Sequence, residues 1–223
     1  MQDDDKRLAA EAAVAEVQDG MLVGLGTGST VRFAIEALGR RAAEGLGIMA
    51  VATSIDSAAK AAAAGIAVRN FADVAQVDLT IDGADEIDAR LWAIKGAGGA
   101  MLREKVVAAA STRMVVIADA TKRVDAIGAA ALPVEVLPFA REFVTARLSR
   151  LGARVARRAG LTDNGNIILD ARFAVFPDAD TLAVAIDEIP GALGHGLFLT
   201  EVDAAYIAHD GIVTRLERDG ATG

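Results

Sequence analysis

The first half of the chain alternates short apolar runs with longer segments in which apolar residues recur every three or four positions. Buried strands are predicted at 21–25, 48–52, 66–68, 77–81 and 114–118. Helical spacing predicts helices at 5–18, 31–43, 54–64 and 99–110. In the first helix, Leu8, Ala12 and Ala15 should share the buried face. This alternation of strands and helices is typical of a mostly parallel, doubly wound sheet.

The pattern changes after about residue 125. Strands are predicted at 132–137, 153–157, 167–170 and 196–199, with helices at 139–151 and 178–186. This β-α-β-β-α-β order is that of the split βαβ, or ferredoxin-like, motif. The last segment, AAYIAHDGIVTRLER, predicts a hairpin around Asp210-Gly211 that returns to the first sheet.

The predicted fold class is therefore α/β. Residues 1–127 and 201–223 are expected to form a Rossmann-like domain with a mostly parallel sheet. Residues 128–200 are expected to form a second, smaller ferredoxin-like α+β domain.

Composition narrows the class of protein. The 223 residues are 53% hydrophobic and 24% charged, which is typical of a soluble globular protein. The net charge of −8 argues against nonspecific nucleic-acid binding. The absence of cysteine excludes disulfides and Cys-ligated zinc, and suits a reducing cytosol. The start, MQDDDKRLAAEAAVAEV, does not resemble a signal peptide, and no apolar run reaches membrane-spanning length. We expect a cytoplasmic protein with neither nucleic acid nor membrane as a partner.

The segment GLGTGST lies where a predicted strand meets a predicted helix. A helix N-terminus offers unpaired N–H groups, and Thr27, Ser29 and Thr30 add hydroxyls, so the turn suits a phosphate. No Lys follows the last Gly as in a P-loop, and the third Gly of a dinucleotide fingerprint is absent. A phosphate ester is therefore favoured over ATP or NAD. The alternative is a tight turn with Ser29 or Thr30 as an ordinary N-cap.

Acidic residues gather in TIDGADEID, which follows a predicted strand. Asp82 should lie at the carboxyl end of that strand, where α/β sheets bind ligands, with Asp85 close enough to share one substrate. Glu86 and Asp88 are expected to face water, because four ionised carboxylates should not crowd together. The alternative for Asp82 is a local turn that closes on the region of Gly83.

Lys95 precedes Gly96-Ala97-Gly98-Gly99, a backbone that can bend around a ligand, and Glu104 follows in the next predicted helix. An ammonium group can stabilise a developing oxyanion, and a carboxylate can act as a general base at a C–H next to a carbonyl. Arg103, Glu104 and Lys105 could instead form an ordinary solvated helix face.

Lys122 in ADATKR could supply a second cation for a phosphate, unless it is a plain surface lysine. His195 and His209 have no partner at metal-binding spacing. Trp92 is expected to pack in the core or to line the crevice.

Seven segments in this order closely resemble the ribose-5-phosphate isomerase A family over nearly the whole chain: GLGTGST, TIDGADEID, KGAGGAMLREK, VIADATK, LPVEVLP, TDNGNIILD and IPGALGHGLF. The resemblance implies interconversion of ribose 5-phosphate and ribulose 5-phosphate in the pentose phosphate pathway, with neither metal nor organic cofactor. It also implies a homodimer or homotetramer. One departure is Ala97, where the family usually has glycine; a left-handed backbone there would strain an alanine.

The resemblance implies a role for each matched residue. Glu104 would be the base that moves a proton between C1 and C2 through a cis-enediolate, and Lys95 would stabilise the enediolate oxygen. Asp82 and Asp85 would bind sugar hydroxyls, and one of them could assist ring opening. The implied substrate-binding residues are Thr27, Gly28, Ser29, Thr30, Asp82, Gly83, Ala84, Asp85, Lys95, Gly96, Ala97, Gly98 and Lys122.

Two other classes remain open at this point. A sugar-phosphate sensor domain could share the glycine turn, but the N-terminus shows no basic recognition helix. An acyl enzyme related to CoA transferases could use Glu104 as a nucleophile, but no second adenine-nucleotide site is visible in the sequence.

Overall fold

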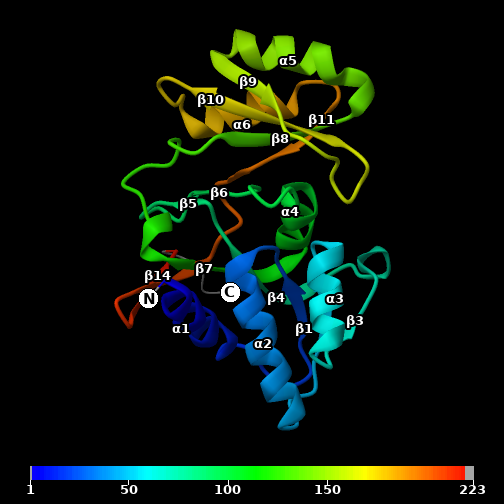
Figure 1. Ribbon diagram of the computed structural model, residues 1–223, viewed down its shortest axis with the longest axis vertical. Coiled ribbons are helices and arrows are strands. Elements are labelled where there is room, and N and C mark those ends of the chain that lie inside the picture. The colour runs from blue at the N-terminus through cyan, green and yellow to red at the C-terminus, as the bar shows by residue number, and fades with distance from the viewer. Residues whose placement is uncertain (1, 219–223) are drawn as a thin grey trace.

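The computed structural model describes residues 2–218, and its largest element is a seven-stranded sheet (Figure 1). The strand order is β14-β13-β7-β4-β1-β2-β3, and every pair is parallel except β13 with β14. The strands are β1 (Leu22–Leu25), β2 (Met49–Ala52), β3 (Ala67–Val68), β4 (Val77–Gly83), β7 (Ser111–Asp119), β13 (Ala204–His209) and β14 (Ile212–Glu217). The prediction of a mostly parallel sheet is confirmed.

Helices cover both faces of this sheet. They are α1 (Gln2–Val14), α2 (Ser29–Ala43), α3 (Ile55–Ala63) and α4 (Met101–Ala109). Strand β7 shows the two faces, because its side chains alternate: Val115 and Ile117 pack with α1 and α2, whereas Met114 and Val116 pack with Met101 of α4. A buried parallel sheet of this kind opens a crevice beyond the carboxyl ends of its strands.

The buried face of α1 agrees with the prediction only in part: Leu8 packs against the core and Ala12 is half-buried. The helix buries Asp5, Ala9, Ala10, Ala13 and Val14, whereas Ala15 lies beyond the helix and is exposed. Alanine occurs on several sides of this segment, so its spacing alone did not identify the face that packs. The correction matters because it turns Lys6 toward the crevice described below.

A second, four-stranded antiparallel sheet has the order β11-β8-β10-β9. Its strands are β8 (Leu132–Val136), β9 (Ala153–Arg157), β10 (Ile167–Phe173) and β11 (Ala192–His195), with α5 (Arg141–Arg150) and α6 (Ala179–Asp187). Both helices pack on this sheet through Val144, Leu148, Leu182 and Ile186, in a core of its own. The β-α-β-β-α-β order is the predicted one, but the last strand lies at 192–195 and not at 196–199.

A three-stranded sheet that the sequence did not predict lies between the other two (Figure 1). It consists of β5 (Glu86–Ile87), β6 (Ala93–Ile94) and β12 (Leu197–Phe198). The predicted strand at 196–199 is this β12, which pairs with β6. Strands of two residues are too short to show a pattern in sequence, and pairing alone defines them.

The C-terminal hairpin joins the large sheet, as predicted, with Asp210 and Gly211 in left-handed conformations at its turn. On this arrangement we propose two domains, residues 1–127 with 201–223, and residues 128–200. None of the helices in the described part of the chain combines the length and apolar character needed to span a membrane.

Candidate active site

The glycine turn brings β1 against β4 and leaves the start of α2 open. Helix α2 begins at Ser29, with Gly28 as N-cap (φ 122°) and no side-chain cap. Ser29 and Thr30 are therefore not the N-cap, and the alternative of an ordinary cap is wrong. Gly26 packs so closely on Asp82 that an added Cβ would lie 1.9 Å from its Oδ1. The N–H groups of the first turn of α2 have no side-chain cap, so they are available to an anion.

Asp82, Lys95 and Glu104 form a buried ionic cluster. The Lys95 Nζ lies 2.8 Å from Asp82 Oδ2 and 3.2 Å from Glu104 Oε2, and it also donates to the Gly83 carbonyl. The three side chains are at most 4% exposed. Asp82 Oδ1 also accepts N–H bonds from Thr27 (3.1 Å) and Gly83 (2.7 Å), so the predicted local turn at Gly83 exists within a larger network.

Burial and mutual repulsion shift the proton affinities of this cluster. Burial, reinforced by the Asp82 charge and only partly offset by Lys95, raises the pKa of Glu104 to about 8. Burial also raises the pKa of Asp82, against the opposing effect of Lys95. For Lys95 burial alone would lower the pKa, but Asp82 and Glu104 raise it above its ordinary value. The cluster therefore holds a charged lysine beside a carboxyl that exchanges its proton near neutral pH.

The glycine-rich loop after Lys95 is shaped by hydrogen bonds. The Ala97 N–H donates to Asp85 Oδ2 at 2.8 Å. Left-handed backbone occurs at Gly96 (φ 108°) and Gly99 (φ 78°), whereas Leu91 and Asp210 are the non-glycine residues of the range 2–218 with positive φ. Ala97 is thus not in the left-handed region, and its backbone does not have the strain that a left-handed alanine would have.

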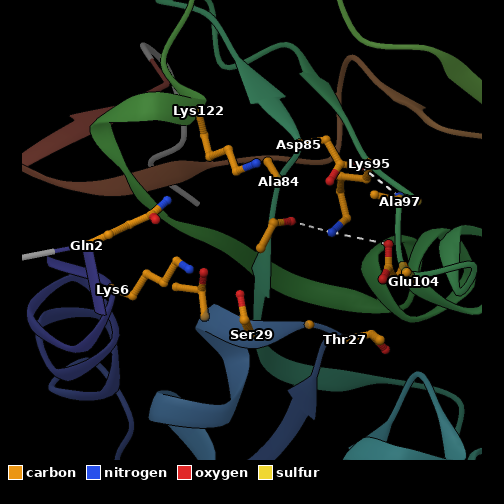
Figure 2. A pocket seen from close by; sticks show the side chains of 15 residues that line it. Gln2, Lys6, Thr27, Ser29, Ala84, Asp85, Lys95, Ala97, Glu104 and Lys122 are labelled. Atoms are coloured by element: carbon orange, nitrogen blue, oxygen red, sulfur yellow. Dashed lines mark hydrogen bonds and ion pairs between the residues drawn. The ribbon is translucent and has the colours of Figure 1, made fainter. Parts of the chain in front are cut away.

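A cavity of about 280 Å³ opens in front of this cluster (Figure 2). All of the predicted site residues except Asp82 line it, together with Gln2 and Lys6. Asp82 lies behind the wall, with its side chain turned to Lys95. Figure 2 shows Lys6, Lys122 and Ser29 toward one end of the cavity and Lys95 and Glu104 toward the other. Lys122 lines the same cavity as the glycine turn, and its role as a second cation for a phosphate stays a prediction.

Sequence reasoning missed Gln2 and Lys6. Both come from α1, far along the chain from the other lining residues, and no local motif surrounds them. A correct prediction of the packed face of α1 would have placed Lys6 away from solvent. Nothing in the sequence, however, places the start of α1 beside α2 and Lys122.

The expectation that Glu86 and Asp88 face water is wrong, because both are buried. Glu86 accepts N–H bonds from Gly128 (2.7 Å) and Ala130 (2.6 Å). Asp88 accepts from the backbone of Arg90 and Trp92 and pairs with the Arg90 guanidinium. A distant segment satisfies Glu86 and the next few residues of its own segment satisfy Asp88, so burial does not require either carboxylate to share the site.

The helix segment Arg103-Glu104-Lys105 is not a solvated face. Glu104 is buried, Arg103 donates to Asn164, and Lys105 pairs with Glu201 at 2.9 Å. Trp92 packs with the core of the four-stranded sheet and under the Arg90 guanidinium, away from the cavity lining.

The structure does bring His209 close to two carboxylates. Ligand atoms of His209, Asp5 and Asp210 lie within 4.8 Å of one another. The Asp5 carboxylate already accepts N–H bonds from Asp210 (3.3 Å) and Gly211 (3.1 Å), so it fastens the turn of the hairpin to α1. The cluster therefore has a structural explanation.

Fold and cavity together define an α/β protein with a small polar site at the carboxyl ends of its parallel strands. The family model for ribose 5-phosphate isomerase A (phosphoriboisomerase A) matches residues 49–211. The chain belongs to the ribose-5-phosphate isomerase A family.

Relatives in that family align over nearly their whole length. The ribose-5-phosphate isomerase A of Sphingopyxis alaskensis is 55% identical over 94% of this chain and 94% of its own. That of Sinorhizobium medicae is 47% identical, over 90% of this chain and 91% of its own. The crystal structure of ribose 5-phosphate isomerase A from Neisseria gonorrhoeae is similar with a TM-score of 0.93 and 38% identity, covering 98% of both chains. A structure of a D-ribose-5-phosphate isomerase in complex with phospho-erythronic acid has a TM-score of 0.94 and 32% identity, covering 98% of this chain and 100% of its own.

Proposed function

We propose that the protein interconverts D-ribose 5-phosphate and D-ribulose 5-phosphate, as a ribose-5-phosphate isomerase of the non-oxidative pentose phosphate pathway. The proposal rests on one observation: the two ends of one cavity differ in their chemical groups. A buried carboxyl and ammonium, Glu104 and Lys95, lie toward one end, and an uncapped helix N-terminus with two lysines lies toward the other.

The phosphate of the substrate would bind the cationic end. The N–H groups and hydroxyls of Ser29 and Thr30 would donate to its oxygens, and Lys6 and Lys122 would balance its charge. A relative solved with phospho-erythronic acid binds a ligand that carries both a phosphate and a carboxylate, which is consistent with a site of two distinct ends. Anchoring the phosphate would align the far end of the sugar with the reacting groups.

Proton transfer would occur at the Glu104 end. In the open-chain aldose, the C2 proton is acidic because the neighbouring C1 carbonyl can accept the electron pair of the broken C–H bond. Glu104 would take that proton, leaving a cis-enediolate with its negative charge on the C1 oxygen. The C2 hydroxyl proton would then pass to the neighbouring C1 oxygen, and Glu104 would return its proton to C1, so that C2 becomes the ketone and C1 the alcohol. The charged Lys95 would stabilise the developing oxyanion.

The two aspartates have different surroundings. Asp85 lines the cavity and would accept a hydrogen bond from a sugar hydroxyl. Asp82 holds the Lys95 ammonium in the free protein, and its contact with a sugar hydroxyl stays a prediction. Which of them assists ring opening also stays a prediction. A cytoplasmic homodimer or homotetramer that needs no added metal or organic cofactor completes the proposal.

The test is a coupled assay of ribulose 5-phosphate formation from ribose 5-phosphate, with EDTA present. The wild-type chain should be active, whereas Glu104→Gln should lose roughly 10²- to 10⁴-fold in kcat with a much smaller change in KM, because Gln keeps the shape but cannot take a proton. Glu142→Gln, at an 80% exposed carboxylate on α5, is the matched control and should behave as wild type.

Near-normal turnover of Glu104→Gln would contradict the assignment of the base. An inactive wild-type chain that still binds ribose 5-phosphate would favour a sugar-phosphate sensor, and activity abolished by EDTA would point to a metal-dependent enzyme.

A further inference from the structure

The loop that carries Lys95 receives two hydrogen bonds from the four-stranded sheet. Arg158 follows directly after β9, and its Nη1 donates to the carbonyl oxygens of Gly96 (2.7 Å) and Ala97 (3.0 Å). The residues that accept these bonds line the 280 Å³ cavity. One guanidinium nitrogen therefore joins the smaller sheet to the wall of the candidate active site.

Asp170 fixes the orientation of that guanidinium. Its Oδ2 accepts from Arg158 Nε at 3.0 Å, and its Oδ1 accepts from Nη2 at 2.5 Å. Asp170 lies on β10, the strand paired with β9. A two-point contact of this kind holds the plane of the guanidinium, so that the remaining nitrogen points in a defined direction.

Packing alone does not hold the loop at this point. Ala97 and Gly98 line the first cavity and also a neighbouring cavity of about 320 Å³, which Arg158 borders as well. Both residues are exposed. With open space on two sides, the position of this backbone depends on its hydrogen bonds. The Gly99 N–H donates to the Gly96 carbonyl within the loop, the Asp85 carboxylate accepts from the Ala97 N–H, and Arg158 donates to the Gly96 and Ala97 carbonyls.

We propose that Arg158, oriented by Asp170, is a positioning residue of the isomerase, which holds the Gly96-Ala97 backbone and thereby the geometry of Lys95 and Asp85 around the substrate. This inference rests on the proposed function. Arg158 acts through the loop and is not assigned a contact with the substrate. Loss of Arg158 should therefore disturb the groups at the reacting end of the sugar, because the phosphate end is formed by α1, α2 and Lys122.

The experiment compares kcat and KM for ribose 5-phosphate in Arg158→Met, Arg158→Lys and Asp170→Asn. Arg158→Met removes every donor and should lower kcat about ten- to a hundredfold, since small displacements of reacting groups have effects of this size. KM should change less than about threefold, because the phosphate contacts stay. Arg158→Lys keeps the charge without the planar fork, so it should lose nearly as much.

Two controls separate positioning from a general loss of structure. Arg157→Met changes the neighbouring arginine, which lines a different surface pocket together with Arg141 and Glu142 of α5. This variant should keep full activity. In the double variant Arg158→Met/Asp170→Asn, kcat should equal that of Arg158→Met alone, because Asp170 is proposed to act only through Arg158. Thermal unfolding of each variant verifies that it is folded.

A folded Arg158→Met or Asp170→Asn variant with kcat within about twofold of wild type would overturn the proposal, and so would full activity of Arg158→Lys or strictly additive losses in the double variant. If Arg158→Met does not fold, the kcat of Asp170→Asn tests the proposal in its place. A wild-type chain without isomerase activity would instead remove the proposed function, and this inference with it.

Discussion

Glu104 illustrates how burial converts an ordinary side chain into a candidate base. It lies in the first turn of α4, where a carboxylate is usually solvated, yet it is 3% exposed and faces both Lys95 and the Asp82 charge behind it. A carboxylate whose pKa is raised is a stronger base once it has lost its proton. A pKa of about 8 brings its proton affinity close to the working range of an enzyme.

The first prediction at the residue scale concerns catalysis against pH. The base must be deprotonated and Lys95 charged, so kcat/KM should rise with pH and level off above about 8, where Glu104 has lost its proton. The raised pKa of Lys95 keeps it charged over this range. Steady-state rates between pH 7 and 9.5 test this, above the second ionisation of the sugar phosphate near pH 6. A flat profile would contradict the role of Glu104.

Stability should respond to pH in the opposite direction. The folded state raises the pKa of Glu104 from 4.5 to about 8, so it favours the protonated carboxyl. The stability from this preference is full below about 4.5 and is lost as the pH rises to about 8. Glu104→Gln cannot ionise and escapes this loss. Its free energy of unfolding, relative to wild type, should increase by at least about 1 kcal/mol between pH 5 and 9.

Urea unfolding at several pH values measures this difference, with Glu142→Gln as the control that should follow the wild-type curve. Parallel curves for Glu104→Gln and wild type would show that the carboxyl is not coupled to its neighbours.

At the scale of elements, the β1–α2 turn does two separate tasks. Gly28 lets the chain enter α2 without a side-chain cap, which leaves the first N–H groups free for a ligand. Gly26 lets β1 approach β4 closely enough for the Thr27 N–H to bond Asp82. The turn thus connects the anion site to the buried cluster, and this explains why glycines occur on both sides of Thr27.

Gly26→Ala should displace Asp82 and thereby disturb the buried cluster of Asp82, Lys95 and Glu104. Its Cβ would meet Asp82 Oδ1 at 1.9 Å and Cγ at 2.0 Å, so the strand or the carboxylate must move. We expect a loss of about 1–3 kcal/mol in unfolding free energy, typical of overpacking, together with a lower kcat. Gly47→Ala is the matched control, because its nearest contact is the exposed Asp19 side chain at 3.1 Å. Unchanged stability and kcat for Gly26→Ala would refute the close approach.

At the scale of the whole molecule, the phosphate end is assembled from segments that lie far apart in the chain. Lys6 comes from α1, Ser29 from α2, and Lys122 from the short 3₁₀ turn that follows β7. Parallel strands place these connections at one edge of the sheet, which is why an acidic chain with a net charge of −8 can still offer a local cationic site.

Lys6→Met and Lys122→Met should each weaken phosphate binding. A charge-assisted hydrogen bond contributes about 1.5–3 kcal/mol, so KM for ribose 5-phosphate and the inhibition constant of inorganic phosphate should each rise about tenfold or more. Lys60→Met, at an exposed lysine paired with Asp56 on α3, should leave both constants unchanged. Unaltered inhibition by phosphate in both cavity variants would place the phosphate elsewhere.

The sequence by itself determined the mostly parallel sheet, the β-α-β-β-α-β succession of the smaller domain and the glycine turn between β1 and α2, because periodicity and glycine turns are local properties. It indicated that Lys95 and Glu104 could open into one crevice, since strand ends of a parallel sheet meet at one edge, and it left Lys122 as either a second cation or a surface lysine. Only the tertiary structure decided that Glu86 and Asp88 are buried structural carboxylates, that Lys6 joins the cavity and that Arg158 reaches the lysine loop. The position of Lys6, the contact of Arg158 and the partners of Glu86 depend on segments that are distant in sequence, and no pattern along the chain contains that information.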